Sequence, residues 1–188
     1  MRDITRRREN GFTLAELLVT LAIGALLLSM AVPSYTGFVQ NSRQITSANE
    51  LLSTLHFARD LAITRNRRIT VCPSNAGLTC EAVDWNEGWL VFADQDGDRQ
   101  VDPGETIERV VTDVDALDMR SPQFDGFLIY RPSGRVMINN VRENRGEFTI
   151  CDKRGADHAR ALIIDLSGRP RVSATAADGG PPVCPVLS

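Results

Sequence analysis

The chain has 188 residues, of which 43% are hydrophobic and 24% charged, an ordinary globular composition that excludes a disordered protein. Twenty-four acidic and 21 basic residues give a formal net charge of −3, which excludes a uniformly basic nucleic-acid-binding protein but not a local basic patch. Only 2 histidines are present, so the chain has few histidine side chains for a metal or catalytic site.

The first predicted element is an apolar helix near the N-terminus. Residues 12–32 read FTLAELLVTLAIGALLLSMAV, with Glu16 as the one charged residue. A helix of this length spans about 30 Å, the thickness of a bilayer core. Four arginines and two acids precede it, so the positive-inside rule predicts a cytoplasmic N-terminus and a single-pass anchor in the membrane. The run is too long for a secretory signal peptide, and no A-x-A cleavage site follows before Pro33.

The junction Gly11-Phe12-Thr13-Leu14-Ala15-Glu16-Leu17 resembles the leader junction of type IV pilins and pseudopilins. This resemblance implies that a prepilin peptidase cuts between Gly11 and Phe12 and that Phe12 is then N-methylated. It also implies an assembly role for Glu16. A carboxylate in an apolar helix needs a cationic partner, and the new amine of a neighbouring subunit would supply one.

Residues 35–67 are predicted to continue as an amphipathic helix. Apolar residues recur there at spacings of three and four, which is a helical stripe suited to packing on a core. The stripe consists of Ile45, Ala48, Leu52, Leu55, Ala58 and Ala62. The expected organisation is a cleaved cytoplasmic leader at 1–11, a transmembrane or filament-core helix at 12–34, the amphipathic helix at 35–67 and a periplasmic β domain at 68–188.

Beyond Arg67 the pattern changes to short runs rich in β-branched residues and bounded by Gly, Pro, Asn or Asp, which predict strands. The expected strands are 68–72, 88–93, 106–111, 127–131, 135–138, 147–151, 161–166 and 171–173. Ser133-Gly134 and Ser167-Gly168 are predicted hairpin turns. A long helix followed by many strands predicts an α+β fold with antiparallel sheets, and the tail from Ala174 is expected to be irregular.

The segment Trp85-Asn86-Glu87-Gly88-Trp89-Leu90-Val91-Phe92-Ala93-Asp94 is followed by Asp96-Gly97-Asp98 and Asp102-Pro103-Gly104-Glu105. This glycine-tryptophan strand with its Asp/Gly-rich turn resembles the FimT/GspH family of minor pilins and pseudopilins. The resemblance covers essentially the whole chain. It implies two small sheets wrapped on the second half of the helix, and other pilins or pseudopilins, the prepilin peptidase and the inner membrane as partners.

Four cysteines, at positions 72, 80, 151 and 184, lie in the part predicted to be periplasmic, where disulfides persist. Four cysteines allow three pairings. The favoured pairing joins Cys72 to Cys80, which closes a short loop, and Cys151 to Cys184, which ties the tail to a strand. A zinc site is not expected, because the chain has no Cys-x-x-Cys pair.

The Asp-rich turn raises the possibility of calcium, while no cofactor is otherwise expected. Its acids fall at the ligand positions of an EF-hand loop, although arginine occupies the usual glycine position and no flanking helices are expected. The candidate ligands are Asp94, Asp96, Asp98, Asp102 and Glu105. The alternative is a solvated acidic hairpin turn, which the family resemblance already implies.

Charge is unevenly distributed along the β domain. Residues 81–125 hold 13 acids and 3 arginines, whereas residues 131–171 hold nine basic residues and five acids. Within the basic half, Gly168-Arg169-Pro170-Arg171 resembles the GRxR motif of DNA-binding FimT proteins. Alternation places Arg169 and Arg171 on one side of an extended segment, and Pro170 predicts a sheet edge or loop. Two guanidinium groups there would suit successive phosphates of double-stranded DNA.

Four further arginines could extend this patch: Arg131, Arg135, Arg154 and Arg160. No nucleophile elbow, phosphate loop or dinucleotide fingerprint occurs, so the chain is not expected to be an enzyme. Three functional hypotheses remain. The first is a minor pilin of a type IV pilus that binds DNA for uptake, the second is a purely structural pilus-assembly subunit, and the third is a GspH-like pseudopilin of type II secretion.

Overall fold

A single long helix, α1 (Leu14–Thr64), leads into a domain of short strands in the computed structural model of the chain. The structure describes residues 11–112, 114, 118–138 and 145–184, apart from the side chains of residues 30, 31, 33 and 34. It separates into two units, Met1–Gln40 and Asn41–Ser188, and α1 contributes to both. Residues 1–10 of the predicted leader lie outside the described residues.

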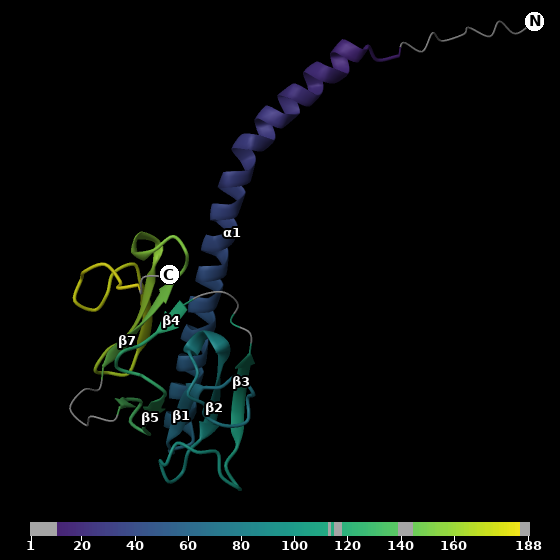
Figure 1. The fold of residues 1–188 in the computed structure, drawn as a ribbon. Coiled ribbons are helices and arrows are strands. Elements are labelled where there is room, and N and C mark those ends of the chain that lie inside the picture. The colour runs from purple at the N-terminus through teal and green to yellow at the C-terminus, as the bar shows by residue number, and fades with distance from the viewer. Residues whose placement is uncertain (1–10, 113, 115–117, 139–144, 185–188) are drawn as a thin grey trace, which may run out of the picture. The chain divides into compact units, whose positions relative to one another are not determined.

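The strands form two antiparallel sheets, so the predicted α+β fold is confirmed (Figure 1). Sheet A has the order β3-β2-β1-β5-β6 and consists of β1 (Ile69–Pro73), β2 (Gly88–Ala93), β3 (Ile107–Thr112), β5 (Leu128–Tyr130) and β6 (Val136–Met137). Sheet B has the order β4-β7-β8-β9 and consists of β4 (Asp118–Arg120), β7 (Gly146–Cys151), β8 (Arg160–Ile164) and β9 (Pro170–Ser173). Two single-turn 3-10 helices, η1 (Trp85–Glu87) and η2 (Ala156–His158), precede β2 and β8.

Every strand expected from the sequence is present, with bounds within two residues of those predicted. The prediction missed β4, a three-residue strand that pairs with β7. Only one of its residues, Met119, is apolar and buried, so no alternating run marks it in the sequence. β4 exists because β7 offers it a pairing edge rather than because its own residues favour extended backbone.

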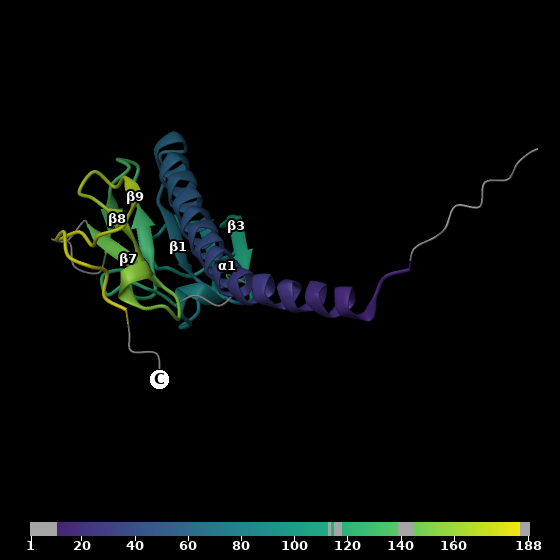
Figure 2. The same cartoon turned by 90° about the horizontal axis from the view of Figure 1, so that it is seen from above.

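The second half of α1 packs on both sheets through one apolar stripe. The buried residues of the stripe are Ala48, Leu51, Leu55, Ala58 and Ala62, each at most 2% exposed. The expectation for Ile45 was wrong, because its side chain is 43% exposed. The buried face instead passes through Gln44 and Leu51, one helical position away from the predicted line. Figure 2 shows this part of α1 running over the strands, with β7, β8 and β9 on one side and β3 on the other.

Three side-chain hydrogen bonds fix the helix relative to the sheets. Gln44 Nε2 donates to the carbonyl of Ile150 in β7 at 3.1 Å. Trp89 Nε1 in β2 donates to Thr54 Oγ1 at 3.2 Å. The third donor, Arg59 Nε, reaches the carbonyl of Gly134 in the turn between β5 and β6 at 3.1 Å. Sheets A and B are therefore both attached to the same helix face.

Two hairpin turns, one from each sheet, meet at glycine residues. Gly134 lies between β5 and β6 with φ of 74°, and Gly168 lies between β8 and β9 with φ of 77°. Both turns were predicted from Ser-Gly pairs. A Cβ added to Gly168 would overlap the carbonyl oxygen of Gly134 and lie 3.0 Å from the Cα of Arg135. Gly168 thus serves two needs, a left-handed backbone and a close approach between the sheets.

We predict that Gly168→Ala destabilises the protein much more than Gly155→Ala. Gly155 has a similar φ of 85°, but a Cβ there would meet no atom within 4 Å. The Gly155 variant should lose about 1–3 kcal/mol from its positive-φ backbone alone. The Gly168 variant should lose about 1–3 kcal/mol more, because its Cβ forces the two turns apart. Chemical unfolding of both variants measures the difference, and equal losses would contradict the contact between the turns.

Candidate functional site

The predicted processing site lies at the start of α1. A Cβ on Gly11 would meet no atom within 4 Å, so the fold itself does not require glycine there. Thr13 and Glu16 form a reciprocal capping box: Glu16 N–H donates to Thr13 Oγ1 at 3.3 Å, and Thr13 N–H donates to Glu16 Oε2 at 3.4 Å. In the isolated chain, Glu16 therefore caps its own helix. Among the described residues, no helix combines the length and hydropathy needed to cross a membrane.

The hairpin of β8 and β9 carries the two arginines of the predicted DNA-binding motif. β9 is the outermost strand of sheet B, as Pro170 predicted. Pro170 is buried while Arg169 and Arg171 on either side of it are exposed, which is the alternation expected of an extended segment. Neither guanidinium group makes a hydrogen bond or ion pair with a described residue. The structure thus presents two exposed cations at a free sheet edge, of which Arg169 lies close enough to Asp165 for their charges to interact.

Asp165 holds the turn that precedes these arginines. Its Oδ1 accepts hydrogen bonds from Ser167 N–H at 2.8 Å, Ser167 Oγ at 2.5 Å and Arg169 N–H at 3.2 Å. These bonds, led by the Ser167 hydroxyl and helped by the charge of Arg169, hold the pKa of Asp165 below its usual range. The hydrogen bonds of the folded turn therefore favour the ionised form of Asp165.

The turn between β5 and β6 adds a third cation beside the hairpin. Arg135 is exposed, and its Cα lies next to Gly168 across the contact between the two turns. Beneath them, the phenol of Tyr130 is fully buried, and burial raises its pKa, which the nearby Arg59 partly offsets. Arg59 thus bonds to Gly134 in the turn that carries Arg135, and this turn meets Gly168, the residue before Arg169.

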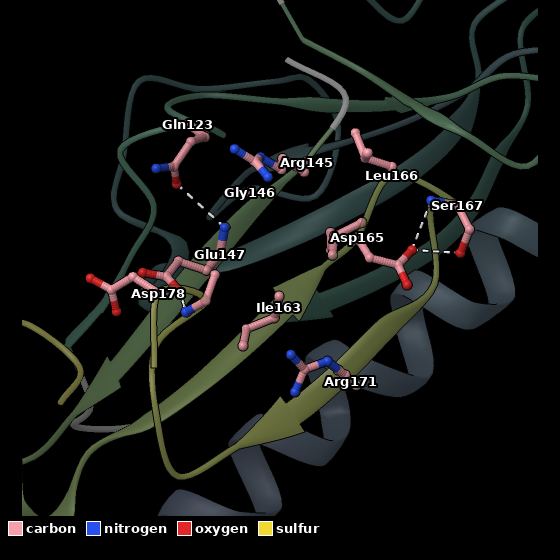
Figure 3. A pocket seen from close by; sticks show the side chains of 12 residues that line it. Gln123, Arg145, Gly146, Glu147, Ile163, Asp165, Leu166, Ser167, Arg171 and Asp178 are labelled. Atoms are coloured by element: carbon pink, nitrogen blue, oxygen red, sulfur yellow. Dashed lines mark hydrogen bonds between the residues drawn. The ribbon is translucent and has the colours of Figure 1, made fainter. Parts of the chain in front are cut away.

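A groove of about 900 Å³ crosses the outer face of sheet B beside the hairpin (Figure 3). Its floor includes Ile163, which pairs with Arg171, and the 60%-exposed Leu166. Arg145 precedes β7 and Arg171 lies on β9, so the two arginines come from opposite sides of β8. Neither guanidinium group makes a hydrogen bond or ion pair with a described residue. Sequence reasoning did not single out Arg145, because no motif surrounds it.

The acids that line this groove are already hydrogen-bonded to backbone groups. Glu147 Oε2 accepts from Ala177 N–H at 2.6 Å, and Asp178 Oδ1 accepts from Gly180 N–H at 2.8 Å. The Asp165 carboxylate accepts a hydrogen bond from Ser167 N–H in its own turn. The groove therefore offers free hydrogen-bond donors from its arginines, while its carboxylates stabilise the surrounding chain.

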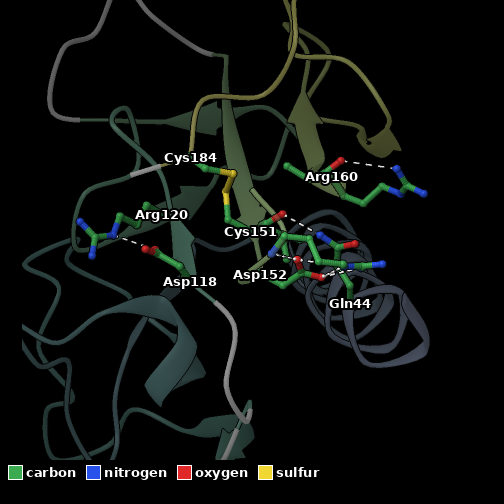
Figure 4. The surroundings of a disulfide bond; sticks show 10 residues. Gln44, Asp118, Arg120, Cys151, Asp152, Arg160 and Cys184 are labelled. Carbon is green, nitrogen blue, oxygen red and sulfur yellow. Dashed lines mark hydrogen bonds and ion pairs between the residues drawn. A yellow bond between two sulfur atoms is a disulfide. The ribbon is translucent and has the colours of Figure 1, made fainter. Parts of the chain in front are cut away.

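Arg154 and Arg160 were expected to extend the basic patch. Arg154 lies in the connection between β7 and β8, and Arg160 lies at the start of β8 (Figure 4). Arg160 begins β8, whereas the hairpin follows the other end of that strand. Arg154 Nε and Nη2 each donate to Asp152 Oδ2, at 2.9 and 2.5 Å. Burial disfavours the ionised form of Asp152, but these bonds outweigh it and lower its pKa. The structure thus does not bring Arg154 and Arg160 together with Arg169.

Both disulfides favoured from the sequence are present. Cys72–Cys80 closes the loop that follows β1, over a sequence separation of 8. Cys151–Cys184 ties the C-terminal tail to β7, over a separation of 33 (Figure 4). The tail therefore stays beside the outer face of sheet B, where Ala177 also bonds to Glu147.

The acidic turn after β2 gathers three of the five predicted calcium ligands. Carboxylate oxygens of Asp94, Asp96 and Asp98 lie within 4.8 Å of one another. Asp94 is buried and accepts hydrogen bonds from Thr70 Oγ1 and Gly97 N–H, both at 2.6 Å. Glu105 instead closes the loop, accepting from Gln95 N–H at 2.7 Å and Asp102 N–H at 3.2 Å. The cluster has a clear role in holding the turn, and calcium binding stays a prediction.

A long N-terminal helix packed on two antiparallel sheets is the architecture of pilin-like proteins. A family model described as "Type II transport protein GspH" matches residues 47–168, well over half of the chain, and one described as "Prokaryotic N-terminal methylation motif" matches residues 6–32. The chain belongs to the GspH family. It is therefore a minor pilin or pseudopilin, of a type IV pilus or a type II secretion system, that associates with other pilin-like subunits.

Solved structures of similar fold come from two bacteria. The type IV minor pilin FimU of Pseudomonas aeruginosa matches with a TM-score of 0.55 and 20% identity, over 76% of this chain and 98% of that chain. A second crystal form of FimU gives 0.51 and 21% identity, over 71% and 97%. The minor pseudopilin EpsH of the Vibrio cholerae Type 2 Secretion System gives 0.46 and 13% identity, over 70% and 96%. At these identities the FimU likeness establishes the fold alone. A comparison with curated protein sequences finds no match.

We predict that Asp165→Asn lowers stability at neutral pH and that this loss disappears in acid. The folded pKa of Asp165 lies below the ordinary value of an aspartate, so the carboxylate contributes stability above that ordinary value. The contribution is lost as the pH falls through the lowered folded pKa. Unfolding free energies of wild type and variant should therefore differ at neutral pH and approach each other as the pH falls below the ordinary pKa of an aspartate toward the lowered folded pKa. Asp157→Asn is the control, and a constant gap between wild type and the Asp165 variant would contradict the role of the turn.

Proposed function

We propose that this chain is a minor pilin of a type IV pilus and that its β8–β9 hairpin binds double-stranded DNA for uptake. The observation that carries the proposal is the exposure of Arg169 and Arg171 on the free edge of sheet B, with no described acid paired to either. Free guanidinium groups at an exposed edge are suited to phosphate oxygens.

The structure supports binding through charge rather than through base recognition. Gly168 and Asp165 fix the turn, so the arginines project from a defined backbone. Arg135 adds a third cation across the contact between the turns. Contacts of this kind go to the DNA backbone, carry no sequence information directly and weaken as salt rises.

The N-terminal segment supports maturation and assembly as in other pilins. We infer cleavage between Gly11 and Phe12, methylation of Phe12 and anchoring in a bacterial inner membrane with the β domain in the periplasm. Large apolar side chains of the first half of α1 are exposed in the isolated chain, among them Leu18, Leu21 and Leu26. Lipid before assembly, and neighbouring helices after it, would cover them. Glu16 would then exchange its bonds to Thr13 for the amine of a neighbouring subunit.

A second function is favoured by the opposite charge of the two halves of the β domain. The acid-rich region 81–125 of one subunit could receive the basic hairpin of another. In that case the chain would be a structural pilus subunit or a GspH-like pseudopilin of type II secretion, and the arginines would serve docking. The two functions differ in whether an isolated domain binds DNA.

We predict that the oxidised unit Asn41–Ser188 binds duplex DNA and that Arg169→Ala/Arg171→Ala reduces the affinity at least about tenfold. This unit contains both disulfides and every residue of the main buried core, so it keeps its own stabilising contacts. Fluorescence anisotropy with labelled duplex, at low and near-physiological salt, measures the affinity. Binding should weaken steeply with salt, because phosphate contacts release counterions.

Arg154→Ala/Arg160→Ala is the matched control, since it removes the same charge from the β7–β8 connection and the start of β8, away from the hairpin. Its affinity should stay within about twofold of wild type if location rather than net charge decides binding. Thermal unfolding of each variant checks that the domain is intact. Failure of the wild-type domain to bind DNA at low salt would reject the DNA role and leave subunit docking as the function.

We predict that a prepilin peptidase removes residues 1–11 of the full chain and that Gly11→Asp blocks this cleavage. The fold does not need glycine at this position, so any requirement would come from the peptidase. Co-expression followed by mass spectrometry should show a chain that begins with methylated Phe12. Glu16→Gln is the control, because it should still be cleaved yet fail to enter filaments. Cleavage of the Gly11 variant at the wild-type rate would refute the assignment of the site.

A further inference from the structure

A second basic region lies where α1 ends. The helix stops at Thr64, and the chain turns at Asn66, whose φ is 50°, before β1 begins. The turn leaves Arg65, Arg67 and Arg68 exposed. Together with Arg131 from the end of β5, they line a pocket of about 760 Å³. No motif marks this cluster, because its members come from two distant parts of the sequence.

Two of these four arginines bond to oxygen acceptors through their side chains, and two do not. Arg65 forms an ion pair with Glu108, and Arg68 Nη1 donates to the carbonyl of Asp96 at 2.8 Å. Arg131 Nη2 lies 2.8 Å from the sulfur of Met137, which is only a weak acceptor. Arg67 makes no side-chain hydrogen bond or ion pair with a described residue. The charges of Arg67 and Arg131 are therefore available to bind an anion. On the side of Arg68, the basic region ends at the acidic turn that follows β2.

The β5–β6 hairpin connects this region to the DNA-binding hairpin. Arg131 N–H donates to the carbonyl of Arg135 at 2.9 Å, so the two residues face each other across the turn. Val136 is buried, and alternation places Arg135 on the same face as Met137, which Arg131 contacts. Arg135 in turn adjoins Gly168, the residue before Arg169. The positions of these residues thus follow one another from the end of α1 to the β8–β9 hairpin.

We propose that Arg67, Arg131, Arg135, Arg169 and Arg171 form one continuous arginine track that holds the phosphate backbone of a DNA duplex along the β domain. This inference rests on the proposed DNA-binding function and extends its site from sheet B to the end of α1. The five residues share one charge and follow one another from turn to turn. Such an arrangement suits a polyanion better than a protein partner, whose interface would need an apolar centre.

The salt dependence of binding tests the track, because its slope counts phosphate contacts. Each contact contributes about 0.9 to the slope of log K against log salt concentration. With the unit Asn41–Ser188 and a duplex of about 20 base pairs, two helical turns, Arg67→Ala/Arg131→Ala should reduce the slope by about 1–2. The variant should also weaken binding about tenfold at low salt. Arg154→Ala/Arg160→Ala, with the same change of charge, should leave the slope unchanged.

A conservative variant separates charge from folding. Arg67→Lys/Arg131→Lys should keep the wild-type slope, because the slope depends on the number of cations at the backbone rather than on their geometry. If the alanine pair leaves the slope unchanged while Arg169→Ala/Arg171→Ala removes binding, the track is wrong and the hairpin site stands. If the wild-type domain binds no DNA, both are wrong. Polyglutamate binding as tight as duplex binding would assign the track to acidic protein surfaces instead.

Discussion

Packing of one apolar stripe of α1 against two sheets is the interaction on which the rest of the structure depends. The strands are two to six residues long, too short to form stable sheets without a shared core. Leu51 and Leu55 are fully buried and each contributes about 1.5–3 kcal/mol through removal from water. Because Gln44, Thr54 and Arg59 bond to groups in both sheets, the helix also fixes where the sheets lie relative to each other.

The basic surface is a consequence of that packing. Arg59 holds the turn at Gly134, and this turn leaves room only for a glycine at position 168. The contact brings Arg135 of sheet A beside Arg169 of sheet B, although 34 positions separate them in the chain. A motif of four residues thereby becomes part of a wider basic region, because a turn from the other sheet completes it.

Acidic residues in the β domain contribute mainly by holding backbone. Asp165 fixes the hairpin, Glu147 receives the tail, and Asp94 and Glu105 close the loop after β2. These carboxylates keep their negative charge while they accept N–H hydrogen bonds, so they still act on nearby arginines, as Asp165 does on Arg169. The second disulfide, Cys151–Cys184, keeps the tail where Glu147 can bind it.

Local patterns in the sequence determined the long helix, eight strands, both glycine turns, the favoured cysteine pairing and the motif at Gly168. They could do so because periodicity, turn residues and cysteine spacing act over a few positions. Tertiary structure alone decided that β4 exists and that Leu51 rather than Ile45 is buried. It also decided that Arg135 joins the hairpin while Arg154 and Arg160 do not. The reason is that these contacts depend on how two sheets pack on one helix and on how long each strand is. No single segment of the sequence determines either.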